Sequence, residues 1–91
     1  MEVKEVVQLA KKYVADLFSD EKIVNVVLEE IRRDKKKEQW LVTVGFQRRW
    51  DESMDRVLYP LPERAYKVVV ISDSNGNVES ILDRASLAIP Q

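Results

Sequence analysis

The chain has 91 residues but no histidine and no cysteine, and these two absences exclude much of the chemistry that proteins use. Without histidine, it lacks the side chain whose unperturbed pKa lies near neutral pH, so Ser–His and Cys–His nucleophile pairs cannot form within one chain. Without cysteine, it can form no disulfide, no thiolate nucleophile and no thiolate zinc site. We therefore expect a non-catalytic protein with no metal and no cofactor.

Glycine is almost as scarce, since Gly45 and Gly76 are the two in the chain and cannot supply a glycine-rich phosphate-binding loop. No apolar run approaches the ~20 residues of a membrane-spanning helix, and the longest is Val68–Ile71. The N-terminal residues 1–5 are charged and lack the pattern of a secretory signal. We expect a cytoplasmic protein that is not attached to a membrane.

Net charge and chain length limit the classes of partner and the number of domains. A net charge of −1 gives no global attraction to nucleic acid or to anionic lipid. The length predicts a single domain over residues 1–91, and 45% apolar residues are enough to close a core. A chain of this size is expected to have a free energy of unfolding of about 5–14 kcal/mol. Each large apolar side chain therefore contributes a substantial share of that free energy.

Apolar periodicity predicts one helix followed by four strands. Over residues 2–18, apolar side chains recur at three- and four-residue steps, which is typical of an amphipathic helix. Alternation with a period of two is clearest over residues 38–47, where Trp40, Val42 and Phe46 share one face. The four predicted strands are residues 23–33, 38–47, 65–72 and 78–85.

Two polar turns join these strands into hairpins. One is the charged segment 34–37, and the other is 73–77, where Gly76 suits a positive φ. The apolar stripe of the helix must be covered, and the sheet is its available partner. We predict an α+β domain with one N-terminal helix packed across a curved four-stranded antiparallel β-meander.

The last hairpin carries Asp73, Gly76 and Val78. In PepSY-like domains this hairpin typically holds an acidic residue, a glycine turn and a valine, and the order of elements over about residues 5–83 resembles that family and the wider cystatin-like group. The resemblance implies a small bacterial protein with a helix-plus-sheet fold. It implies no catalytic residue, because the family pattern contains none.

The segment between the second and third strands has no period and is predicted to be a long loop, where binding residues are often found. Its aromatic side chains can bury large areas against a partner. They can equally fold back as a lid over one end of the sheet. The candidate binding residues here are Arg48, Arg49, Trp50 and Tyr59.

Basic residues concentrate over residues 32–49, which hold seven Lys and Arg against two acidic residues. If the first two strands pair, the lysine turn and Arg48 lie at opposite ends of the hairpin, as two small patches. Weak nucleic-acid binding through these patches is one interpretation. An ordinary solvated turn is the other.

The sheet face away from the helix is a second candidate surface. If the Trp40 face of the second strand packs on the helix, we expect an apolar patch on the other side, which is typical of an interface. A partner protein, a second copy of the chain or the C-terminal Leu87 and Ile89 could cover it. The residues expected there are Leu41, Thr43, Val69 and Ile71.

Carboxylates provide the enzymatic alternative. Asp51, Glu52 and Asp55 lie in the loop, and Glu29 and Glu30 should face opposite sides of their strand and so cannot act as a pair. A small-ligand binder or enzyme with a pocket between helix and sheet would need one carboxylate with a raised pKa. We expect instead a protein-interaction module that binds another protein or forms a homodimer, with ligand or nucleic-acid binding as alternatives.

Overall fold

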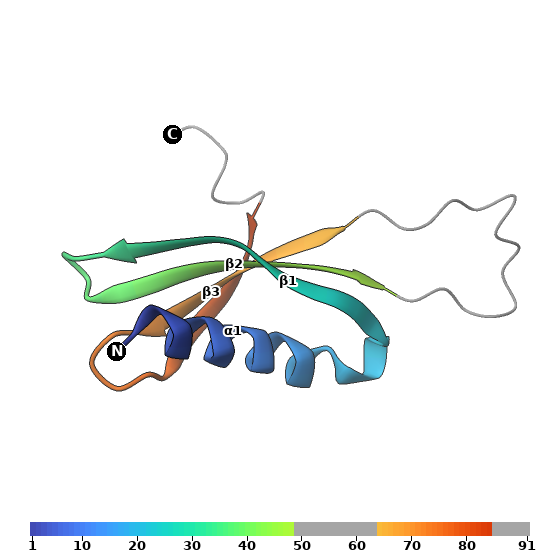
Figure 1. The fold of residues 1–91 in the computed structure, drawn as a ribbon, viewed down its shortest axis with the longest axis horizontal. Coiled ribbons are helices and arrows are strands. Elements are labelled where there is room, and N and C mark those ends of the chain that lie inside the picture. The colour runs from blue at the N-terminus through green and yellow to red at the C-terminus, as the bar shows by residue number, and fades with distance from the viewer. Residues whose placement is uncertain (49–63, 85–91) are drawn as a thin grey trace, which may run out of the picture.

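The computed structural model describes residues 1–48 and 64–84, which form one layer of helix on one antiparallel sheet. The strands are ordered β1-β2-β3-β4, and α1 lies on one face of the sheet (Figure 1). This confirms the predicted α+β fold. The elements are α1 (Val3–Leu17), the 3-10 helix η1 (Ser19–Glu21), β1 (Ile23–Asp34), β2 (Gln39–Arg48), β3 (Ala65–Ser72) and β4 (Val78–Asp83).

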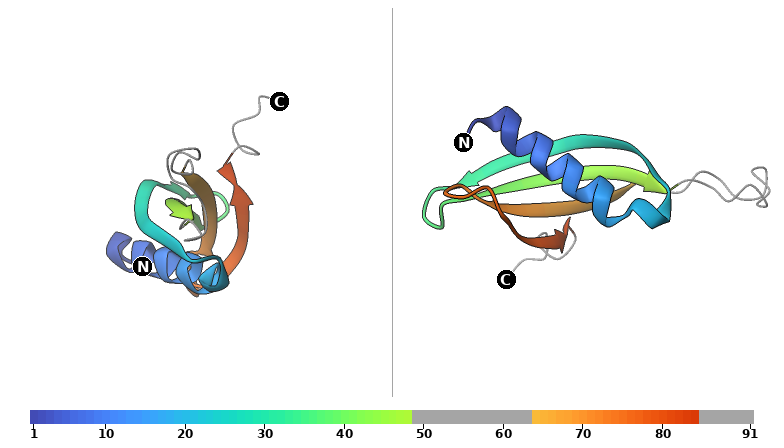
Figure 2. Two further views of the ribbon diagram at one scale, coloured as in Figure 1. Left: turned by 90° about the vertical axis from the view of Figure 1, so that its right-hand side faces the viewer. Right: turned by 90° about the horizontal axis from the view of Figure 1, so that it is seen from below.

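Helix α1 runs obliquely across the strands (Figure 2). It presents one apolar stripe to them. Val6, Ala10 and Val14 recur every four residues and are fully buried. On the outer side of the helix, Lys12 and Asp16 form an exposed ion pair. The spacing of the stripe therefore sets which side of α1 meets the sheet. No helix in the described part of the chain combines the length and the apolar character needed to cross a membrane.

The core lies between α1 and the middle strands. Cα partners across an antiparallel pair point to the same face, and Val42 pairs with Val69 while Trp40 pairs with Ile71. Val42, Val69 and Ile71 are all fully buried in the cluster that packs on α1. The remaining buried members of this cluster are Val6, Ala10, Val14, Val44 and Phe46.

The predicted position of Val69 and Ile71 on the uncovered face is therefore wrong. Both side chains face the helix and have no exposed area. The error arises because β3 contains four consecutive apolar residues, 68–71, so its sequence carries no alternation that would show which side is inward. Pairing with β2 decides it, since a shift of one residue would exchange the two faces.

Strand β1 contains two irregularities in its pairing with β2, one after Val24 and one after Leu28. At the second, Glu30 pairs with Thr43, on the face away from α1. Glu29 lies on the same face, because a Cβ built on Gly45 would meet its Oε1 at 2.8 Å. The prediction that Glu29 and Glu30 face opposite sides is wrong, since a bulge inserts one residue and breaks the alternation.

Both predicted turns are confirmed. At the β1–β2 turn, Oδ1 of Asp34 accepts hydrogen bonds from the backbone N–H groups of Lys36 and Lys37, each at 3.1 Å. At the β3–β4 turn, Gly76 has φ +72° and its N–H donates to the carbonyl of Ser72 at 2.9 Å. Local side-chain acceptors and a glycine at positive φ therefore close the two hairpins, as the sequence indicates.

Candidate protein-interaction surface

The face of the sheet away from α1 has an apolar centre with little accessible area. Leu41 and Thr43 lie on this face, as predicted, because they alternate with the buried residues of β2. Thr43 is 7% exposed, and its β3 neighbours Val68 and Val70 are 3% and 6% exposed. Leu41 is only half-buried. It is therefore the residue of the predicted patch whose apolar surface a partner can reach.

At one end of this face the charged side chains are already engaged with one another. Arg64 lies 3.7 Å from Glu29 and donates a hydrogen bond to the backbone carbonyl of Asn25 at 3.0 Å. The guanidinium of Arg84 stacks over the ring of Tyr66, 4.6 Å from its centroid. Charges of both signs therefore lie at this end, where Arg64 neutralises Glu29.

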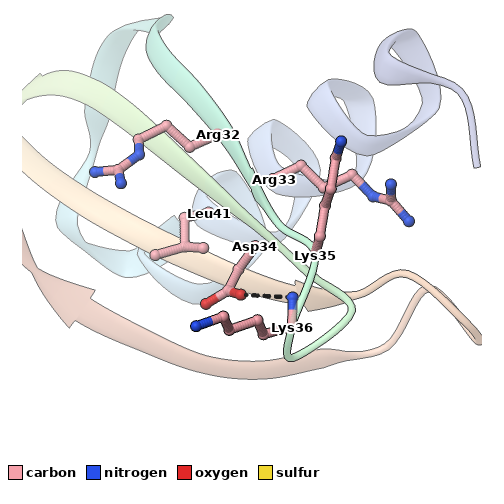
Figure 3. Close-up of a pocket in the computed structure, with 6 residues that line it drawn as sticks. All are labelled: Arg32, Arg33, Asp34, Lys35, Lys36 and Leu41. Carbon is pink, nitrogen blue, oxygen red and sulfur yellow. Dashed lines mark hydrogen bonds between the residues drawn. The ribbon is translucent and has the colours of Figure 1, made fainter.

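At the opposite end, residues of the β1–β2 hairpin line an open pocket of about 460 Å3. Leu41 lies beside Arg32, its Cα partner on β1. Figure 3 shows that Arg32, Leu41 and Lys36 extend on one side of the hairpin, whereas Arg33 extends to the other. We call this site the Leu41 pocket; its lining residues are Arg32, Arg33, Asp34, Lys35, Lys36 and Leu41.

The Leu41 pocket is electropositive because most of its cations lack a carboxylate partner. Among the described residues, no carboxylate forms an ion pair with Arg32 or with any lysine from 35 to 37. Asp34 also lines the pocket, where its Oδ1 accepts the two backbone hydrogen bonds of the turn and its carboxylate contributes one negative charge. Because Arg32, Lys35 and Lys36 outnumber this carboxylate, the hairpin presents a net positive charge around one apolar side chain.

Asp73, in the β3–β4 turn, forms hydrogen bonds that connect this turn to the β1–β2 hairpin. Its Oδ1 accepts a hydrogen bond from the indole N–H of Trp40 at 2.7 Å, and its Oδ2 accepts one from Arg33 at 2.6 Å. Its backbone N–H donates to the carbonyl of Glu38 at 2.8 Å. The hydrogen bond from Trp40, followed by that from Arg33, lowers the pKa of Asp73 below its ordinary value of 3.8. The carboxylate thus holds the two turns together.

This lowered pKa predicts an acid-dependent loss of stability. A carboxyl group whose pKa is lower in the folded state stabilises the fold above its unfolded pKa, and the contribution is lost as pH falls through 3.8 toward the folded value. We expect Asp73→Asn to be less stable than the wild type at neutral pH. The difference should shrink below pH 3.8, as measured by urea denaturation across that range. A difference that stays constant with pH would contradict the role of the charged Asp73.

Arg48, one of the predicted binding residues, is engaged within the protein. Its Nε lies 2.9 Å from Oε1 of Glu21, and its guanidinium stacks over Phe46 at 5.6 Å. The pairing of Ile23 with Arg48 and of Asp34 with Gln39 confirms that the two basic patches lie at opposite ends of the hairpin, about 30 Å apart for nine residues of strand.

Three of the predicted binding residues, Arg49, Trp50 and Tyr59, lie outside the described residues. So do the loop carboxylates and the C-terminal residues that could cover the sheet. Their roles, like that of Arg48 in binding, stay predictions.

Sequence reasoning counted Arg32, Lys35 and Lys36 in a basic run but did not connect them with Leu41. The run itself is visible in the sequence. The link depends on the pairing of β1 with β2, which places Arg32 opposite Leu41. The signal that could have found it is the turn itself, because counting outward from residues 34 and 39 gives this pairing and both bulges of β1 lie farther from the turn.

No protein-family model, no curated protein and no solved structure matches the chain. The resemblance to PepSY-like domains therefore stays a prediction. What the domain does must be inferred from its own residues.

Proposed function

We propose that this domain is a non-catalytic protein-interaction module that binds a partner protein at the Leu41 pocket. The observation that supports it is a half-buried leucine surrounded by cations without described carboxylate partners. An apolar centre with a polar rim is the usual anatomy of a protein interface. Homodimerisation through the sheet face stays a weaker prediction, because the centre of that face has little accessible apolar area.

The packing of the core favours this proposal over a ligand pocket between helix and sheet. That space is filled by apolar side chains, of which Phe46 and Ile71 are the largest. Glu30, one of the carboxylates considered for such a pocket, is exposed on the face away from α1. A ligand between α1 and the sheet would have to displace packed core, at a cost of several kcal/mol.

The contacts of Asp73 also favour binding at the Leu41 pocket. They hold Trp40, Arg33 and the β3–β4 turn in one arrangement beneath the β1–β2 hairpin. Binding to an ordered surface loses less conformational entropy than binding to a mobile one. The β1–β2 hairpin is therefore ordered before a partner binds, so binding does not have to supply the free energy of ordering it.

Because the chain contains no cysteine, a single introduced cysteine can be labelled uniquely. We expect Lys37→Cys, which lies next to the pocket in the turn and carries a photo-activated crosslinker, to give one discrete adduct in a lysate of the native host, identified by mass spectrometry. The matched control is Lys12→Cys on the outer side of α1, where the lysine side chain is 75% exposed. Equal labelling from both positions, or no adduct from Lys37→Cys, would contradict the proposal.

A further inference from the structure

We infer that the partner segment recognised by the Leu41 pocket is acidic, with carboxylates that flank an apolar side chain. This inference rests on the proposed function and names the chemistry of the partner. It follows from the charge of the pocket, from the arrangement of its side chains and from the surroundings of the hairpin.

The charge of the pocket is the first ground. Arg32, Lys35 and Lys36 lack ion-pair partners among the described residues, and Lys37 lies next to them in the turn. At physiological ionic strength charges act together within about 8 Å. Residues 32–38 hold five basic and two acidic side chains, so cations still outnumber carboxylates at the pocket, although the whole chain has a net charge of −1.

The arrangement of side chains is the second ground. Arg32 and Lys36 extend on the same side of the hairpin as Leu41, and the carboxylate of Asp34 lies on that side too, next to Lys36 (Figure 3). A guanidinium can bind a carboxylate through two parallel hydrogen bonds, and an ammonium acts as a point charge. Leu41 can meanwhile pack against an apolar side chain. A segment with acidic residues on either side of a leucine or valine would satisfy all three contacts.

The surroundings favour an acidic peptide over a nucleic-acid strand. A nucleic-acid strand carries a negative charge on every nucleotide, so a strand leaving the pocket along β1 would meet the exposed carboxylate of Glu30 on the same face, which a short peptide need not reach. The next basic residue along the hairpin, Arg48, is at its far end and paired with Glu21. The aromatic side chain nearest the turn, Trp40, is bonded to Asp73 and covered by Arg33, 5.8 Å from its centroid, so it is not free to stack on a base.

The test is fluorescence anisotropy with a short labelled peptide in which glutamates flank a central leucine. We expect the full chain to bind it, to lose affinity as salt is raised, and not to bind the same peptide with glutamine for glutamate. The double variant R32Q/K36Q should bind about tenfold more weakly. The control K4Q/K12Q removes the same charge from α1 and should bind as the wild type does.

Two outcomes would overturn the inference. One is equal binding of the glutamate and glutamine peptides, or equal affinity of R32Q/K36Q and the wild type. The other is tighter binding of a single-stranded RNA of equal charge, which would favour nucleic acid. If the Lys37→Cys adduct still forms but its crosslinked segment is not acidic, the inference fails while the proposed function stands. Loss of the adduct would remove both.

Discussion

Replacement of Phe46 by alanine is expected to lower the free energy of unfolding by about 3–5 kcal/mol. Phe46 is fully buried, and its ring packs on Phe18 with a centroid distance of 5.3 Å and an interplanar angle of 33°. It also supports the guanidinium of Arg48. A domain with a total stability of about 5–14 kcal/mol would lose a large part of it, because the small core cannot collapse around the missing ring.

Urea denaturation followed by circular dichroism measures this change. Leu17→Ala is the matched control, since Leu17 is 47% exposed and its truncation should change stability by less than about 1 kcal/mol. Phe46→Leu should lie between the two. A loss below about 1 kcal/mol for Phe46→Ala would mean that the ring is not packed between α1 and the sheet.

The second large effect separates the two faces of the sheet. Val69→Asp should destabilise by about 3–5 kcal/mol, because it places an unpaired carboxylate in the core beneath α1. Leu41→Asp should cost clearly less, since Leu41 is half-buried beside Arg32 and Lys36, which can neutralise the new charge. The sequence pattern by itself predicts that both positions lie on the same uncovered face, and therefore predicts equal tolerance.

The comparison uses the urea midpoints of the two variants at neutral pH. Equal stability of Val69→Asp and Leu41→Asp would contradict the register in which Val42 pairs with Val69. The thermal midpoint provides an independent check, because a domain of this size shifts by roughly 4–8 °C for each kcal/mol.

The register also explains how the pocket differs from the rest of its face. Near Gly45, Glu29 occupies the space that a side chain would fill and pairs with Arg64. Near Leu41, the corresponding position on β1 is Arg32, which has no described partner. Glu29 and Arg64 neutralise each other at one end, whereas at the hairpin end Arg32, Lys35 and Lys36 outnumber Asp34. The hairpin end is therefore the better suited of the two to an acidic partner.

Local features of the fold could be predicted because they depend on neighbours in the chain. The stripe of Val6, Ala10 and Val14 repeats with the period of a helix, and β2 alternates with the period of a strand. The turn at Gly76 needs only a residue that accepts positive φ. Each of these patterns is short enough to be recognised within a few residues.

The candidate site could be predicted only in part. Leu41 was placed on its face by the alternation of β2, and the lysine turn was visible as a basic run. Nothing in the sequence showed that Arg33 would be neutralised by Asp73, 40 residues away, or that Arg48 would pair with Glu21. Such partners decide which charges stay available, and they become neighbours only when the strands pair.

The elements, their order and the two tight turns follow from the amino-acid sequence, because helical and strand periods and turn chemistry are set by residues close in the chain. The face of β3 that meets α1 depends on strand pairing instead, because residues 68–71 are apolar on both sides. Strand pairing also decided that Glu29 and Glu30 share a face, since a bulge forms against a partner strand. Both the orientation of β3 and the shared face of Glu29 and Glu30 depend on cross-strand pairing, which no single segment of the chain encodes.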